Sequence, residues 1–200
     1  MIDKMKIPLD THNLQGSSIS LEKLDNTHRK ELKSIALEPS HWTYFPYSIT
    51  AESFDDWFNK ALEKTYSGTE ACMVVRANHS GNLVGSSRFY EVDLAASRLS
   101  IGHTFYSPEA RGTITNPECK LLMLTHAFET LQLERVEFKA DSRNVRSLAA
   151  LKKLGATKEG TLRKHMTLAN GYTRDSVVFS ILKTEWFNTV KVNLLTRIEK

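Results

Sequence analysis

Residues 101–116 read IGHTFYSPEARGTITN, and they lead from a strand through a Pro-containing turn and an Arg-Gly loop into a helix. Asn116 is a good N-cap, Pro117 suits the first helical position, and Glu118 favours the first turn. The first N–H groups of a helix have no partner within the helix, and the helix dipole adds positive charge there. The stretch therefore predicts a strand–loop–helix unit suited to an anionic group such as phosphate.

Periodicity on either side of this stretch predicts further strands and helices. We expect strands near Ser17–Leu24, Ala71–Arg76, Leu83–Tyr90, Arg98–Tyr106 and Arg135–Ala140, and helices near Thr27–Leu37, Glu52–Thr65 and Asn144–Leu154. Two last strands flank Asn170-Gly171, a pair that favours a tight type I′ turn. The order predicts one α/β (α+β) domain over residues 1–200, with an N-terminal extension at 1–16 and a C-terminal helix at 183–200.

Composition excludes several classes of protein. No apolar run approaches the ~20 residues that cross a membrane, and the N-terminus lacks the apolar core of a signal peptide, so we expect a cytoplasmic protein without a membrane partner. The net charge is +4, but Lys and Arg are interspersed with Asp and Glu, which predicts no nucleic-acid partner. Two cysteines make neither a disulfide framework nor a metal set, so no metal is expected.

A set of short motifs follows the main helix in a fixed order. They comprise Asp141, Asn144, Ser147, Leu154, Gly155, Ala156, Glu159 and Gly160. Together with IGHTFYSPEARG, NGYTRDSVVFSIL and the closing Glu-Trp pair, they are the strongest pieces of a likeness that spans nearly the whole chain. The chain resembles the GCN5-related N-acetyltransferase (GNAT) superfamily, in particular the RimJ/RimL-like branch of ribosomal-protein N-terminal acetyltransferases.

The resemblance implies a GNAT fold with a mixed, mostly antiparallel central sheet flanked by helices. It implies a splay between the fourth and fifth strands, which end near Tyr106 and Ala140, with acetyl-coenzyme A (acetyl-CoA) in the gap. The implied cofactor-binding residues are Thr104, Phe105, Tyr106, Arg111, Gly112, Thr113, Thr115, Asn116, Lys120 and Asn144. The family's small residues in the pyrophosphate loop are replaced by Ile114 and Asn116, which predicts a reshaped cradle supported by hydroxyls and by Lys120.

Ser147 and Asn144 share the start of one short helix. The resemblance places Ser147 beside the thioester sulfur, where a hydroxyl can protonate the departing thiolate as a general acid. The alternative is a helix-start serine without chemistry. Asn144 can act as an N-cap, as a ligand of the pantetheine arm, or as both.

Three residues are candidates for the general base that takes a proton from the acceptor ammonium. His103 titrates near neutrality and lies on the expected strand beside the thioester, on one face with Leu99, Ile101 and Phe105. It can equally be a core histidine held by one hydrogen bond. Glu91 and Glu159 are the carboxylate alternatives, and each can equally be a solvated or structural acid.

The aromatic segment between the first two helices is expected either to line the acceptor site, through His41, Trp42 and Tyr44, or to form a core lid.

The resemblance implies an N-acetyltransferase that transfers acetyl from acetyl-CoA to a primary amine in a ternary complex. The alternative is a catalytically silent acyl-CoA-binding sensor or interaction module on the same fold. The acceptor is open, since fold does not specify it. A homodimer is expected from the family and from an apolar stripe on the C-terminal helix.

Overall fold

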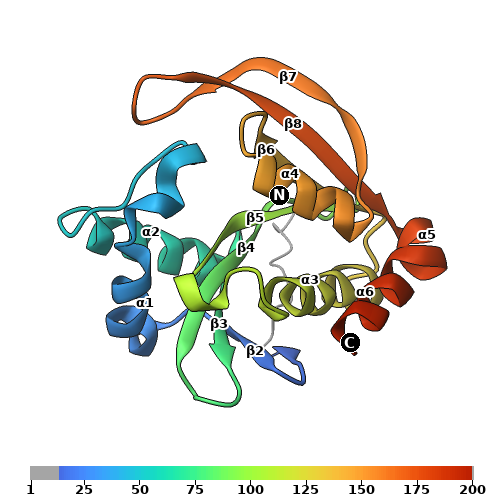
Figure 1. The fold of residues 1–200 in the computed structure, drawn as a ribbon, viewed down its shortest axis with the longest axis horizontal. Helices are drawn as coiled ribbons and strands as arrows, with labels where there is room; N and C mark the ends of the chain where they lie inside the picture. Colours follow the sequence, from blue (N-terminus) through green and yellow to red (C-terminus); the bar gives the residue numbers. More distant parts are fainter. Residues whose placement is uncertain (1–13, 200) are drawn as a thin grey trace.

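The structure is a computed structural model that describes residues 14–199. Its strands form one eight-stranded sheet in the order β1-β2-β3-β4-β5-β6-β8-β7 (Figure 1). Their bounds are β1 Leu14–Gln15, β2 Ile19–Lys23, β3 Ala71–Ala77, β4 Leu83–Asp93, β5 Arg98–Tyr106, β6 Arg135–Asp141, β7 Thr157–Thr167 and β8 Thr173–Leu182. All neighbouring strands are antiparallel except β5 and β6, which confirms the mixed, mostly antiparallel sheet.

Helices cover both faces of this sheet. The α-helices are α1 Arg29–Ala36, α2 Phe54–Ser67, α3 Thr115–Thr125, α4 Val145–Leu154, α5 Lys183–Glu185 and α6 Lys191–Ile198. Three 3₁₀ turns, η1 Asn26–His28, η2 Pro39–Tyr44 and η3 Pro108–Ala110, and two π turns, η4 His126–Thr130 and η5 Trp186–Val190, complete the elements. None of the helices between residues 14 and 199 combines the length and apolarity that a membrane crossing requires.

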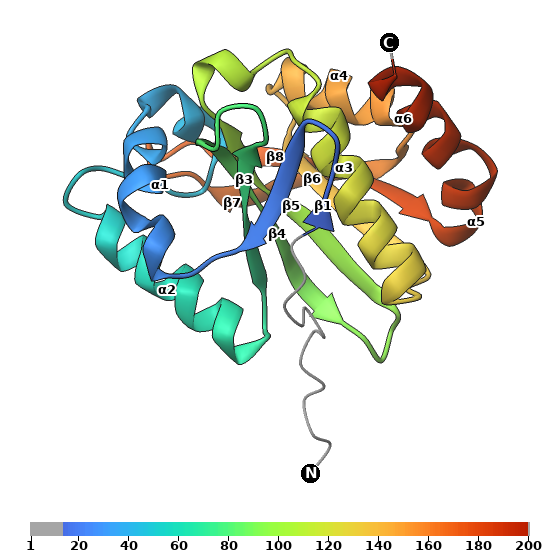
Figure 2. The same ribbon diagram turned by 90° about the horizontal axis from the view of Figure 1, so that it is seen from below.

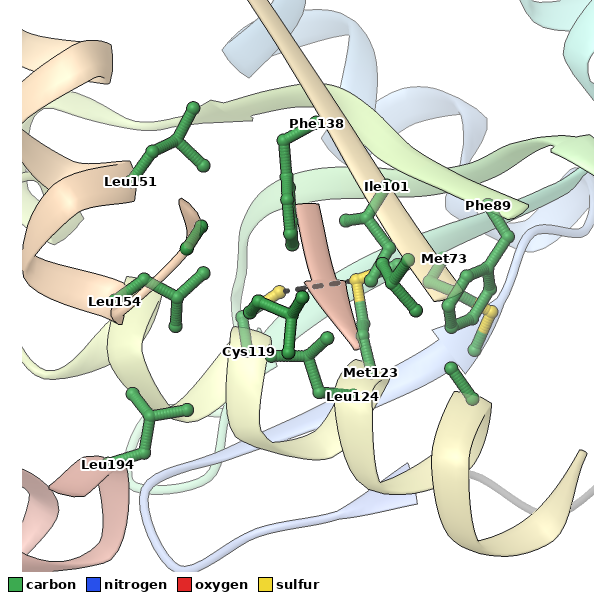
Figure 3. Close-up of a cluster of buried hydrophobic side chains, with 14 of the residues drawn as sticks. Met73, Phe89, Ile101, Cys119, Met123, Leu124, Phe138, Leu151, Leu154 and Leu194 are labelled. Atoms are coloured by element: carbon green, nitrogen blue, oxygen red, sulfur yellow. Dashed lines mark hydrogen bonds between the residues drawn. The ribbon is translucent and has the colours of Figure 1, made fainter. Parts of the chain in front are cut away.

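Alternation along the strands divides the core into two layers. Met73 and Val75 of β3 pack in the larger cluster with α3, α4 and α6, whereas Cys72 and Val74 pack in the second cluster with α1, η2 and α2. Figures 1 and 2 show α1 and α2 on one side of the molecule and α3, α4 and α6 on the other. In the larger cluster, Cys119, Met123 and Leu124 of α3 meet Phe138, Leu151, Leu154 and Leu194 (Figure 3).

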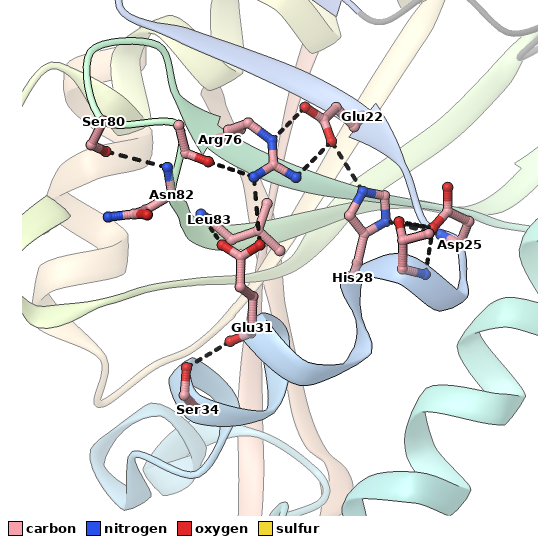
Figure 4. Close-up of polar contacts among 11 residues, drawn as sticks. Glu22, Asp25, His28, Glu31, Ser34, Arg76, Ser80, Asn82 and Leu83 are labelled. Atoms are coloured by element: carbon pink, nitrogen blue, oxygen red, sulfur yellow. Dashed lines mark hydrogen bonds and ion pairs between the residues drawn. The ribbon is translucent and has the colours of Figure 1, made fainter.

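A polar cluster ties α1 to the edge of the sheet (Figure 4). Arg76 of β3 donates to both carboxylate oxygens of Glu22 on β2, at 2.6 and 3.0 Å, and Glu22 also contacts His28 at 3.0 Å. Glu31 of α1 accepts from the backbone N–H of Leu83 at 2.9 Å. These bonds fix the helical layer that carries the aromatic segment.

The predicted turn type at Asn170-Gly171 is wrong. The β7–β8 hairpin closes through the backbone pair of Leu168 N–H and Tyr172 C=O at 2.8 Å, and of the loop residues 169–171 only Gly171 has positive φ, +81°. A type I′ turn needs positive φ at both Asn170 and Gly171, so the chain uses a three-residue loop in which glycine takes the left-handed position. The aromatic segment between α1 and α2 contains η2. Of the N-terminal extension, residues 14 and 15 form β1, and residues 1–13 lie outside the described part.

Candidate active site

The sheet opens between β5 and β6. The two strands pair only at Arg98–Arg135, Leu99–Val136 and Ser100–Glu137. Beyond these pairs, β5 continues to Tyr106 and β6 to Asp141, while β6 stays paired with β8 as far as Asp141. The expected splay is thus present, and the facing backbone edges of both strands are open to a ligand that can hydrogen-bond to them.

A β-bulge reshapes β5 at the splay. The register with β4 shifts between Ser86 and Arg88, and His103 adopts a φ of +50°, which is rare for a residue other than glycine. Ile101, before the bulge, packs in the cluster with α3, whereas Phe105, after it, packs in the cluster with α1 and α2. Phe105 therefore does not share a face with Leu99 and Ile101, and the prediction of a single face for these residues and His103 is wrong.

The loop from Ser107 to Ile114 leads into α3 at one end of the splay. α3 begins at Thr115, so the predicted N-cap at Asn116 is wrong. The hydroxyl of Thr113 accepts from the N–H of Thr115 at 3.2 Å, which ties down one free donor before Asn116 is reached. Asn116 instead accepts from the Tyr106 hydroxyl at 3.2 Å. Gly112 is exposed with φ +77°, a conformation that favours glycine.

α4 begins at the other strand of the splay. Asn144 is its N-cap, and its side-chain oxygen accepts from the N–H of Ser147 at 3.0 Å. Just before it, Asp141 is fully buried and accepts from Arg143 at 2.8 and 3.0 Å, which anchors the end of β6. The predicted role of Asn144 as an N-cap is confirmed. Ser147 is half-buried in the first turn of α4.

Comparisons with known proteins identify the family. Residues 19–157 match the family described as Acetyltransferase (GNAT) domain, well over half of the chain. The chain belongs to the GNAT acetyltransferase family. It is 34% identical over 109 residues to "Putative ribosomal N-acetyltransferase YdaF" of Bacillus subtilis, a match that covers 54% of this chain and 58% of that protein. The match therefore spans little more than half the length of this curated relative.

Solved GNAT structures extend the likeness to most of the chain. A GCN5-related N-acetyltransferase from Brucella melitensis superposes with a TM-score of 0.85 at 25% identity, covering 94% of this chain and 85% of that one. RimJ of Mycobacterium smegmatis, solved in complex with CoA-disulfide, has a TM-score of 0.77 at 19% identity and covers 94% and 97% of the two chains. The second likeness concerns the fold alone.

Within this GNAT fold, His103 lies in an aromatic cage. Its Nδ1 is 2.8 Å from the hydroxyl of Tyr47, whose ring stacks on the imidazole at 5.8 Å, and the ring of Tyr90 packs edge-on at 4.8 Å. Burial, and then the nearby charge of Arg88, lower the pKa of His103 to about 4. Burial also raises the pKa of Tyr47 to about 12, so the phenol keeps its proton and donates to Nδ1. A neutral imidazole whose Nδ1 accepts a hydrogen bond has little proton affinity. The role of His103 as general base stays a prediction.

This low pKa makes stability depend on pH. Between pH 6.5 and 4 the unfolded chain binds a proton at His103 that the folded chain does not, so the free energy of unfolding falls as the pH is lowered, by ~2–3 kcal/mol from this group. His103→Gln should remove that part of the slope. Urea denaturation of both proteins at pH 7 and pH 4.5 measures it, and identical losses in the two proteins would contradict the assignment.

The two carboxylate candidates lie at the closed end of the splay. Glu91 accepts from Lys139 at 2.5 Å and from Ser100 at 2.8 Å, beside the last β5–β6 pair. Burial alone would raise its pKa, but these bonds outweigh burial and lower it. Glu159 accepts from Ser180 and from Arg135, near the start of β6. The bond from Ser180, and then the bond from Arg135, lower the pKa of Glu159. Both placements fit structural acids held in ion pairs.

Lys120 lies inside α3 with its ammonium turned into the sheet. The ammonium donates to the hydroxyls of Ser87, at 3.2 Å, and Thr104, at 3.0 Å, and the residue is 7% exposed. Burial lowers the pKa of the ammonium. This placement does not fit the predicted contact with phosphate, because the group is enclosed between α3, β4 and β5. Thr104 likewise points its side chain to this face and offers only backbone to the splay.

Arg111 joins the loop to the aromatic segment. It donates to the carbonyl of Tyr106 at 3.0 Å, to Ser40 at 3.2 Å and to Nδ1 of His41 at 2.8 Å. The other ring nitrogen of His41 then donates to the carbonyl of Ile35 at 3.1 Å. Burial, and then the charge of Arg111, lower the pKa of His41, so the imidazole is neutral. Through its two ring nitrogens it connects the loop from Ser107 to Ile114 with α1.

The predicted acceptor-side residues divide into core and surface. Trp42 is buried, donates to the carbonyl of Ala36 at 2.8 Å and packs on Phe105, so it belongs to the core lid, as His41 does. Tyr44 is half-buried, and its carbonyl accepts from Arg174 of β8 at 2.9 Å. Tyr44 is therefore the least buried of the three, and its role in lining the acceptor site stays a prediction.

Sequence reasoning missed Arg174 and Arg88, both buried near this end of the sheet. A signal for Arg174 existed: in TRDSVVFSIL, every second residue from Arg174 to Ser180 has the spacing of one sheet face, and three of the four are polar. Arg88 has no such signal. Between residues 14 and 199, no group of three or more His, Cys, Asp and Glu side chains is placed to hold a metal ion.

Proposed function

We propose that this protein transfers an acetyl group from acetyl-CoA to a primary amine by direct attack in a ternary complex. The observation that carries the proposal is the splay of β5 and β6, with the start of α3 at the end of β5 and Ser147 of α4 at the end of β6. Family membership and the names of the relatives support acetyl transfer.

The residues present fit acetyl-CoA. The unpaired edges of β5 and β6 offer backbone donors and acceptors to the amides of a pantetheine arm. At the start of α3 the backbone N–H of Asn116 offers a donor to a pyrophosphate, since the N–H of Thr115 is bound to Thr113 and Pro117 has none. Gly112 and Thr113 are exposed at that helix start. RimJ of Mycobacterium smegmatis and spermidine N-acetyltransferase from Vibrio cholerae, which share the fold, were solved with CoA-disulfide and with CoA and spermine.

Acetyl-CoA, when bound, supplies an acetyl thioester, and this chain's residues act around it. A backbone N–H of β5 beyond the bulge, in the run from Thr104 to Tyr106, polarises the acetyl carbonyl while the neutral amine attacks it. Ser147 donates its hydroxyl proton to the departing thiolate and regains one from water. Water, with His103, Glu91 or Glu159 as the predicted bases, accepts the proton of the amine.

Calorimetric titration of acetyl-CoA tests the donor site. We expect acetyl-CoA to bind at least tenfold more tightly than acetyl-pantetheine, because only the former brings phosphates to the α3 N-terminus. Thiol release should then require an added amine. Donor binding without amine-dependent thiol release would instead support the catalytically silent acyl-CoA-binding module. Absence of any binding would overturn both readings.

The homodimer and the cytoplasmic location stay predictions. The dimer was inferred from an apolar stripe of four residues. Trp186, Val190 and Leu194 of this stripe pack into the chain's own core, and Ile198 is half-buried. A dimer through this helix would therefore use its outward residues, among which Phe187 and Val192 are 47% and 58% exposed.

A further inference from the structure

One face of β6 and β8 is polar and lies opposite the core. Val136, Phe138 and Ala140 of β6 pack in the cluster with α3 and α4. The alternate residues of β6 and the residues of β8 in register with them point to the other face. Its polar members are Arg135, Glu137, Lys139, Asp141, Arg174, Ser176 and Ser180, and Val178 and Leu182 are its apolar members. We call this surface the polar face. It adjoins His103 and Tyr90 across the splay.

The carboxylates on and around the polar face are bound to cations. Asp141 pairs with Arg143 at 2.8 Å, Glu91 with Lys139 at 2.5 Å, and Glu70 with Arg88 at 2.8 Å. Glu137 and Glu159 share Arg135, at 3.0 and 2.7 Å. Each of these carboxylates is therefore already paired with a cation of the protein itself.

Arg174 is a cation of the polar face that forms no ion pair with these acids. It is 7% exposed, and its Nε and Nη1 donate to the hydroxyl of Ser176 and to the carbonyl of Tyr44, each at 2.9 Å. Both acceptors are neutral, and among residues 14–199 Arg174 forms no ion pair within 4 Å, since the nearby Asp141 is paired with Arg143. A buried charge without a counter-charge in contact is costly. Burial lowers the pKa of this guanidinium, and the charge of Asp141 opposes that shift.

The position of Arg174 places it at the acceptor side of the splay. Asp141, the last residue of β6, pairs with Ser176, so Arg174 lies just beyond the end of β6. Its bond to Tyr44 joins residues 130 apart in sequence and brings the β7–β8 hairpin to η2 (Figure 1). Arg143 stacks on the ring of Tyr172 at 3.4 Å and faces that of Tyr44 at 5.7 Å. Arg174 thus lies between the acceptor segment and the strand that leads to Ser147.

We propose that Arg174 binds a carboxylate of the acceptor, so that the acceptor is a carboxylate-bearing amine and not a polyamine. The inference rests on the proposed acetyl transfer. A carboxylate would supply the directly contacting counter-charge that Arg174 lacks, and the planar guanidinium suits it. A polyamine would need free carboxylates for its ammonium groups, and those of the polar face are occupied.

Paired acceptors test this proposal with acetyl-CoA at saturation and thiol release as the readout. One pair is the peptide amide Ser-Glu-Glu-Ala against Ser-Gln-Gln-Ala, and the other is glutamate against its diamide, so that the two pairs separate a peptide side chain from a free amino acid. Spermidine is the third arm. We expect the wild type to prefer the carboxylate member of at least one pair by about tenfold or more in kcat/KM.

Substitutions assign the preference to Arg174. Arg174→Gln should raise KM for the preferred acceptor about tenfold more than it raises KM for the amide counterpart, and Arg174→Lys should recover part of the preference. Arg98→Gln, which removes a half-exposed cation paired with Asp93 at 3.5 Å, should change neither. Equal or better turnover of spermidine or of the amides by the wild type, or an equal loss for both members in Arg174→Gln, would overturn the proposal.

A binding measurement separates this proposal from the proposed function. Calorimetry of each acceptor into the CoA-saturated protein should show tighter binding of the carboxylate member, lost in Arg174→Gln. If no amine releases thiol, acetyl transfer fails, and this titration still decides whether Arg174 holds a carboxylate. Thermal unfolding of each variant confirms that the fold persists. A carboxylate member that binds no better than its amide overturns the assignment of Arg174.

Discussion

Replacing Glu70 by Gln is expected to lower the free energy of unfolding by ~3 kcal/mol, because it leaves a buried guanidinium without its carboxylate. Glu70 accepts from Arg88 at 2.8 Å and from Lys64 at 2.6 Å. The side chains of Glu70 and Arg88 are 16% and 8% exposed, and Arg88 makes no other ion pair among residues 14–199. Its Nε and Nη2 already lack a hydrogen-bond partner there. Urea denaturation at pH 7 measures the change.

Glu134→Gln is the matched control, because its side chain is 65% exposed and its pair with Lys183 spans 3.4 Å. Exposed pairs contribute ~0–1 kcal/mol. Burial alone would raise the pKa of Glu70, but the bonds to Lys64 and Arg88 lower it overall. Its stabilisation is thus present above about pH 4.5 and is lost as pH falls through the lowered pKa. The gap between wild type and Glu70→Gln should narrow in acid; a control loss as large as the Glu70 loss would refute the buried-pair account.

Replacing Ser147 by Ala is expected to reduce kcat about 100-fold and to leave the dissociation constant of acetyl-CoA unchanged. The reason is that a general acid acts in the transition state and adds little to ground-state binding. The helix itself should persist, because Asn144 caps it through the backbone N–H of Ser147 and not through the hydroxyl. Steady-state kinetics and calorimetry measure the two quantities separately.

Ser34→Ala provides the control, since the hydroxyl of Ser34 is exposed on α1 and bonds only its own helix, at 2.7 Å to the carbonyl of Glu31. It should keep the wild-type kcat. Full activity in Ser147→Ala would remove the general-acid role from the proposed mechanism. A weakened acetyl-CoA affinity would show that Ser147 contributes to donor binding instead.

Much of the fold was predictable because it depends on near neighbours in the sequence. The helix ending at Gly155, the cap at Asn144 and the buried stripe of Trp186, Val190 and Leu194 each follow from residues within one to three turns. The splay was predicted only through the family resemblance, which the motif set after β6 helps to carry. Where local signals competed, as at Asn116 and Asn170-Gly171, the prediction failed.

The candidate site was less predictable because its contacts join distant parts of the chain. Strand alternation placed His103 and Phe105 on one face with Leu99 and Ile101, but pairing with β4 inserts a bulge, and Phe105 lies on the opposite face from Leu99 and Ile101. Periodicity showed that Lys120 lies on α3 and did not show that Ser87 and Thr104 receive its ammonium. No short-range rule relates Arg174 to Tyr44.

The sequence by itself determined which segments are strands and helices, which of their faces are mostly buried, and the family of the fold. These features follow from local periodicity, capping and ordered motifs. Only the tertiary structure decided which charges are paired. Glu70, Glu91 and Glu159 meet their cations through sheet register, and the same register leaves Arg174 without an acid. Ion pairing depends on distances of a few ångströms between residues far apart in the chain, and chain folding alone sets those distances.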